Sequence, residues 1–96
     1  MTDLDKAKAL FFEALDFLDA SDFQAAEARL RQALRLSPTN PAILTNLSLA
    51  LLQQGKRRDA RELAAKVVAA DARNVEALLV LADCQAQAGE LSAALR

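Results

Sequence analysis

The 96-residue sequence contains no histidine, tyrosine or tryptophan, and only two glycines, two prolines and one cysteine. Without histidine the commonest general acid or base is missing and Cys84 has no imidazole to activate it, so we expect no enzyme activity. A lone cysteine forms neither an internal disulfide nor a thiolate metal site within one chain, which favours a reducing compartment. Two distant glycines exclude a phosphate-binding glycine loop, and we expect no cofactor.

Charge and hydropathy exclude two further classes of partner. The formal net charge is −1, so no overall field draws the chain to nucleic acid or to an anionic membrane. Residues 1–10 are acidic and then amphipathic, unlike a secretory signal, and no apolar run approaches the roughly 20 residues of a membrane span. We therefore expect a cytoplasmic protein with neither a nucleic-acid nor a membrane partner.

A period of 34 residues runs through the sequence. It separates Leu10, Leu44 and Leu78 from one another, and Gly55 from Gly89. Hydrophobic residues make up 53% of the chain, and their abundance beside so little glycine and proline favours an all-helical protein. A period of this length is typical of helical hairpins that bury their apolar faces by stacking. The repeats span residues 7–40, 41–74 and, incompletely, 75–96.

Local signals predict six helices. Ser21, with Gln24 three residues later, has the pattern of a capping box that begins a helix. Asn40 followed by a proline is a second helix start, because asparagine caps free amides and proline at the first position loses no hydrogen bond. Gly55 and Gly89 suit the left-handed residue that closes a helix. The predicted helices span about 4–19, 22–36, 41–54, 57–70, 74–88 and 90–96.

Small residues recur in the predicted helices at the repeat period. Ala26, Ala60 and Ala94 occupy the same position in the three repeats. We expect two helices to cross closely there, because a side chain larger than alanine would push the backbones apart. Apolar residues three and four positions apart form the inward stripes of the helices. These stripes are Leu10–Ala14–Phe17 and Leu44–Ser48–Leu51 in the inner helices, and Ala26–Leu30–Ala33–Leu34 and Ala60–Ala64–Val67–Val68 in the outer ones.

The segments ALFFEALDFLDASDFQAAEARLRQALRLSPTN and AILTNLSLALLQQGKRRDARELAAKVVAADARN resemble tetratricopeptide repeats, and the resemblance covers nearly the whole chain. Its signature columns hold Leu10, Ala14, Phe17, Ala26, Leu30, Ala33 and Pro38 in the first repeat, and Leu44, Leu47, Ser48, Leu51, Gly55, Ala60 and Val67 in the second. The sequence departs from the pattern at Glu13, Ala72 and Gln85. The resemblance implies an all-α, right-handed superhelical solenoid of antiparallel helix hairpins, as a single domain over residues 1–96.

The resemblance also implies that the inner helices line a concave groove for a protein or peptide. The corresponding columns here are mostly large and apolar, and a contiguous exposed apolar patch usually marks a binding site. Alternatively, these side chains pack against helices outside this sequence. The groove residues so predicted are Phe11, Leu15, Leu18, Thr45, Asn46, Leu49, Leu52, Leu79 and Asp83.

Chaperone-binding relatives hold a partner's carboxylates with lysines, an arginine and asparagines. Only Asn46 matches that set here, so the resemblance implies a groove without a carboxylate clamp. We expect a bacterial protein–protein interaction scaffold. Two alternatives stay open: an N-terminal segment of a larger bacterial enzyme, of the glycosyltransferase or methyltransferase type, that docks substrate protein, and a small secretion chaperone.

Cations gather at the start of the predicted helix 57–70. Lys56, Arg57, Arg58 and Arg61 oppose the helix dipole there, so helix propensity does not explain them. They form either a docking patch for an acidic partner or a solvated face on which acidic residues interleave. Cys84, by contrast, has only acidic charges near it in sequence, so nothing is expected to lower its pKa.

The third repeat stops before most of its outer helix. The face formed by Leu78, Leu81 and Ala82 is therefore expected to be partly open, whereas solenoid ends are normally covered by a polar helix. The same face on another copy would cover it in a two-fold dimer. We expect self-association through the third repeat.

Overall fold

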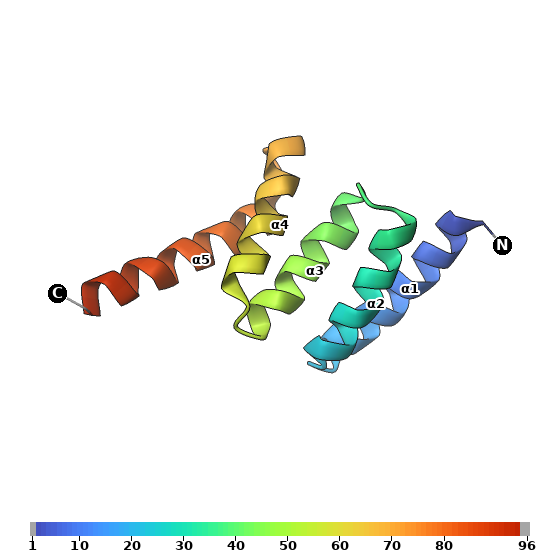
Figure 1. The fold of residues 1–96 in the computed structure, drawn as a ribbon, viewed down its shortest axis with the longest axis horizontal. Coiled ribbons are helices and arrows are strands. Elements are labelled where there is room, and N and C mark those ends of the chain that lie inside the picture. Colours follow the sequence, from blue (N-terminus) through green and yellow to red (C-terminus); the bar gives the residue numbers. More distant parts are fainter. Residues whose placement is uncertain (1, 95–96) are drawn as a thin grey trace.

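The computed structural model describes the backbone of residues 2–94 and the side chains of residues 2–84. Successive antiparallel hairpins, α1 with α2 and α3 with α4, lie in a row, and α5 follows them (Figure 1). The molecule is elongated, with extents of 56 × 28 × 18 Å. It is the predicted all-α helical-repeat solenoid. The helices are α1 (Asp3–Asp19), α2 (Phe23–Leu36), α3 (Pro41–Gln53), α4 (Arg57–Ala70) and α5 (Val75–Ala94).

Two asparagines one period apart begin the inner helices α3 and α5. The Asn40 side-chain oxygen accepts hydrogen bonds from the amides of Ala42 at 3.0 Å and Ile43 at 3.3 Å. The Asn74 oxygen accepts one from the Ala77 amide at 3.0 Å. Each satisfies amides that have no partner inside the helix. The predicted start at Asn40 is confirmed.

Gly55 closes α3 as predicted. Its φ of +81° is left-handed, and its amide donates to the carbonyl of Leu52 while the amide of Lys56 donates back to Leu51. This pair of bonds satisfies the last free carbonyls of the helix. The same motif closes α1, but there the left-handed residue is Ser21, with φ +60°.

The predicted capping box at Ser21 and Gln24 is therefore wrong. Ser21 occupies the position that Gly55 holds one period later, and it ends α1 rather than beginning α2. The side chain of Asp22 caps α2 instead, accepting from the Ala25 amide at 3.2 Å. The left-handed conformation costs a non-glycine residue about 1–2 kcal/mol.

The predicted break at Gly89 is also wrong, because α5 continues through it to Ala94. Glycine in a helix interior costs about 1 kcal/mol relative to alanine. A turn at Gly89 would give up several backbone hydrogen bonds of the helix. Continuing α5 through Gly89 keeps the backbone hydrogen bonds and so costs less free energy than a turn there. The predicted helix 90–96 is thus part of α5 as far as Ala94, and residues 95–96 lie outside the described part.

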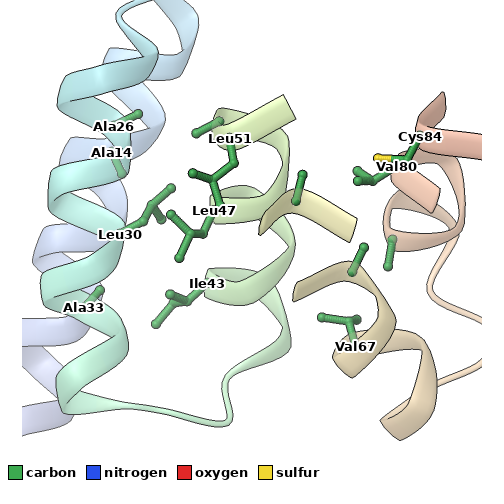
Figure 2. Packing of buried hydrophobic residues seen from close by; sticks show 14 residues of the cluster. Ala14, Ala26, Leu30, Ala33, Ile43, Leu47, Leu51, Val67, Val80 and Cys84 are labelled. Carbon is green, nitrogen blue, oxygen red and sulfur yellow. The ribbon is translucent and has the colours of Figure 1, made fainter. Parts of the chain in front are cut away.

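The buried core joins each hairpin to the next. Leu30 of α2 is fully buried and points toward Ile43 and Leu47 of α3 (Figure 2). Ala26 and Ala60 have no exposed surface, as expected for the small residues at close helix crossings. The side chain of Ala94, the third member of that column, lies outside the described residues.

The departure from the repeat pattern at Glu13 has a simple structural basis. The equivalent residue of the second repeat, Leu47, is fully buried because α3 is enclosed by α2, α4 and α5. Glu13 on α1 is exposed and forms a 3.0 Å ion pair with Arg29 of α2. A polar residue is tolerated at this end of the described stack because no described helix packs over it.

A polar cluster around Glu27 also connects the two hairpins. Its carboxylate accepts hydrogen bonds from Arg31 at 2.7 Å, from Lys56 at 3.0 Å and from Gln54 at 2.9 Å. Burial alone would raise the pKa of Glu27, but these hydrogen bonds outweigh it and lower the pKa to about 2. The ionised carboxylate therefore ties α2 to the turn between α3 and α4.

We predict that Ala60→Leu destabilises the protein by about 1–3 kcal/mol, because the added side chain has no space where α4 crosses its neighbours. For a domain of this size the melting temperature should fall by several degrees or more, measured by circular dichroism. Ala65→Leu, at an exposed position of the same helix, is the control. Equal melting curves for Ala60→Leu and the unmodified protein would contradict the close crossing.

We also predict that the Glu27 cluster makes stability depend on acid pH. The folded pKa of Glu27 lies below its reference value of 4.5, so its stabilisation is complete above about pH 4.5 and is lost as pH falls toward 2. Arg31 and Lys56 are nearly half exposed, so solvent screening limits the effect to about 1–2 kcal/mol.

Urea unfolding at a series of pH values measures this contribution. Glu27→Gln should be less stable than the unmodified protein at pH 7, and the difference should shrink below pH 4. Glu62→Gln, on an exposed position of α4, is the matched control. A difference that stays constant with pH would contradict the role of the ionised carboxylate.

Candidate peptide-binding groove

A small apolar hollow lies between the beginnings of α1 and α3. Its volume is about 100 Å³. The exposed Leu4 and the half-buried Phe11 border it, and Lys8 is the one charged residue in its lining. We call it the apolar hollow. The lining residues are Leu4, Ala7, Lys8, Phe11, Asn40, Ala42 and Ile43.

A larger and more open hollow, of about 670 Å³, lies between the beginnings of α3 and α5. Five of its eight described lining residues are polar, and Glu76 is the ionisable one among them. We call it the polar hollow. Its lining residues are Asn40, Pro41, Ala42, Thr45, Asn46, Asn74, Val75 and Glu76.

The predicted groove residues differ in their accessibility. On α5, Leu79 is 60% exposed and Asp83 is also exposed. The large apolar residues of α1 and α3 are only half-buried, and most of them also pack against the core. These half-buried residues are Phe11, Leu15, Leu18, Leu49 and Leu52, of which all but Leu15 contact the core cluster.

Thr45 does not reach the surface as the prediction required. It is 1% exposed, and its hydroxyl has no hydrogen-bond partner within the described part of the chain. In the same column, Phe11 of α1 is half-buried and Leu79 of α5 is exposed. The difference follows from position, because α3 lies between neighbouring helices on both sides whereas α1 and α5 each have a face that no described helix covers.

Asn46 is half-buried at the polar hollow, and its side-chain amide donates to the Ala42 carbonyl of its own helix at 2.8 Å. Glu76, the charged neighbour in the hollow, would repel a partner's carboxylate. Val80, in one of the columns where clamp-bearing relatives have a cation, is buried. Neither Glu76 nor Val80 therefore offers a cation to a partner's carboxylate at these two positions.

Sequence reasoning did not include the beginning of α1 in the candidate groove. Leu4 and Lys8 line the apolar hollow together with Phe11, yet neither was among the predicted site residues. A signal was available, because Leu4, Phe11 and Leu18 are spaced by seven and so share one face of the helix.

Sequence reasoning also gave the wrong surroundings for Cys84. The cysteine is 5% exposed, and Arg57 and Arg61 of α4 lie close enough to favour its ionisation, opposed by Asp83. Burial is the larger effect and raises the pKa of the thiol. The cations beside it are distant in sequence and adjacent only in the fold.

The described residues contain neither a metal-binding cluster nor a membrane-spanning helix. No group of three or more histidine, cysteine, aspartate or glutamate side chains there is placed to hold a metal ion. Nor is any described helix both long enough and apolar enough to cross a membrane.

The repeat geometry agrees with a comparison to known families. A family profile described as tetratricopeptide repeat matches residues 17–74 and again residues 51–96. The two matches begin at Phe17 and Leu51, which are one 34-residue period apart. No match was found among curated proteins. The stacked hairpins, the period and the profile match over most of the sequence together show that the chain belongs to the tetratricopeptide repeat family.

Proposed function

We propose that this protein binds an apolar segment of a partner protein along the face formed by α1, α3 and α5. Tetratricopeptide repeats generally mediate protein–protein interactions and are typically not enzymes. The observation that carries the proposal is the apolar hollow, bordered by the exposed Leu4 and lined by Phe11. A partner side chain placed there would remove apolar surface from water at both residues.

The residues of the polar hollow indicate what charge the rest of the bound partner segment should carry. Asn46 and Asn74 border it, and Glu76 gives it negative charge. Asp83, exposed on α5, adds a second carboxylate on the same helix. We propose a ligand that is apolar at the α1 end and neutral or basic at the α5 end, bound in a reducing compartment such as the cytoplasm.

Peptides selected from a random display library against the protein test this function. The half-buried Leu49 and Leu52 pack against the core, so aspartate there would disturb the fold. The exposed Leu4 and Leu79 are the better targets. We predict that Leu4→Asp combined with Leu79→Asp weakens binding of the selected peptides at least about tenfold, because it places charge where apolar contact is expected.

The matched control replaces Phe12 and Ala65, exposed residues of α1 and α4, with aspartate. This variant should bind the same peptides within about twofold of the unmodified protein, a free-energy difference below about 0.5 kcal/mol. If the control loses binding and the Leu4/Leu79 variant keeps it, peptides bind elsewhere and the proposed groove is wrong.

The exposed apolar face of α5 favours self-association as a second function. Leu78 is 42% exposed, Leu81 is half-buried and Ala82 is exposed. In the preceding repeat the equivalent Leu47 and Ser48 are fully buried in the hairpin of α3 and α4. We propose that two copies cover this face by pairing α5 with α5 about a two-fold axis, the simplest closed arrangement.

Light scattering over a wide concentration range tests the pairing. We predict that the unmodified protein forms dimers at high concentration and that Leu78→Asp shifts the equilibrium toward monomer, because charge would be buried between two apolar faces. Phe12→Asp, on the far end of the stack, should leave the dimer unchanged. A monomeric unmodified protein throughout the range would refute the proposal.

A further inference from the structure

Three arginines surround a hollow between α4 and α5 that is separate from the groove. Its volume is about 190 Å³. Arg57, Arg58 and Arg61 come from the first two turns of α4, and Cys84 of α5 is the fourth residue of the described lining. We call it the arginine hollow. The arginines bring positive charge to the hollow, and burial raises the pKa of the neighbouring Cys84 thiol.

The positive charge of the arginine hollow is not balanced by ion pairs within the described part of the chain. All three salt bridges found there use other cations. The fourth cation of the run, Lys56, turns away to Glu27 of α2 and so belongs to the contact between hairpins. The nearest acidic residues along these helices, Asp59, Glu62 and Asp83, are exposed and form no described salt bridge with the three arginines.

The position of the three arginines at the start of α4 makes their unbalanced positive charge still less favourable in the isolated protein. Helices α1, α2 and α3 are each capped by a side-chain oxygen, from Thr2, Asp22 and Asn40 respectively. The capping residue of α4 is Lys56, which makes no such hydrogen bond. Positive side chains therefore stand where the helix dipole is already positive and where amides have no side-chain partner. An external carboxylate would relieve both effects.

The geometry points to a carboxylate side chain of an acidic protein segment as the ligand of the arginine hollow. Arginine donates paired hydrogen bonds to a carboxylate, and several together hold one more firmly than a single cation would. A nucleic acid is the less suitable polyanion, because no aromatic residue lines the hollow to stack on a base and the net charge of the chain is −1.

Fluorescence anisotropy with a labelled oligoglutamate peptide at low ionic strength tests this inference. We predict that the peptide binds the unmodified protein and that Arg58→Gln combined with Arg61→Gln weakens its binding at least about tenfold, because two charge-assisted contacts are removed. Both residues are exposed, and circular dichroism should show unchanged helix content. Added salt should also weaken binding.

The matched control is Arg35→Gln combined with Lys66→Gln, which removes the same net charge from exposed positions of α2 and α4. Equal weakening in the control, or no binding of oligoglutamate at all, would overturn the inference. Tighter binding of oligodeoxythymidylate of matched charge, or of inorganic phosphate, would overturn the choice of an acidic protein segment. The groove variant Leu4→Asp with Leu79→Asp should still bind oligoglutamate, which separates this inference from the proposed function.

Discussion

The packing of α2 on α3, where Leu30 points toward Ile43 and Leu47, is the interaction on which the rest of the structure depends (Figure 2). A helical hairpin cannot bury its apolar face alone, so the first hairpin is stable only with the second beside it. Glu27 reinforces the same junction through Lys56. Because this junction fixes the spacing of α1 and α3, it also fixes the apolar hollow between them.

Much of the fold was predictable because its determinants are local or periodic. Asn40 caps the beginning of α3 and Gly55 closes its end. Ala26 and Ala60, one period apart, are buried at close helix crossings. Ser21 was misread because serine is a favoured helix cap and only rarely adopts the left-handed conformation that it has here. Aligning the two repeats places Ser21 at the position of Gly55, which indicates a left-handed residue that ends α1 rather than a cap that begins α2. At Gly89 the period predicted a turn that the chain does not make.

The candidate site was less predictable than the fold, because accessibility depends on which helices enclose a residue. One column holds the half-buried Phe11, the buried Thr45 and the exposed Leu79, and nothing in the residues themselves distinguishes these environments. The charges beside Cys84 show the same limit. They come from Arg57 and Arg61, more than twenty positions away, and only the packing of α5 on α4 brings them together.

The antiparallel hairpins place the two proposed binding surfaces at opposite ends of α3. The apolar and polar hollows lie where α3 begins, near Asn40, whereas Arg57 follows the turn at Gly55 where α3 ends. A helix of this length separates them by about 20 Å. A partner could therefore engage both surfaces only with two distinct segments, one apolar and one acidic. Each surface can accordingly be altered without disturbing the other, because the core around Leu47 lies between them.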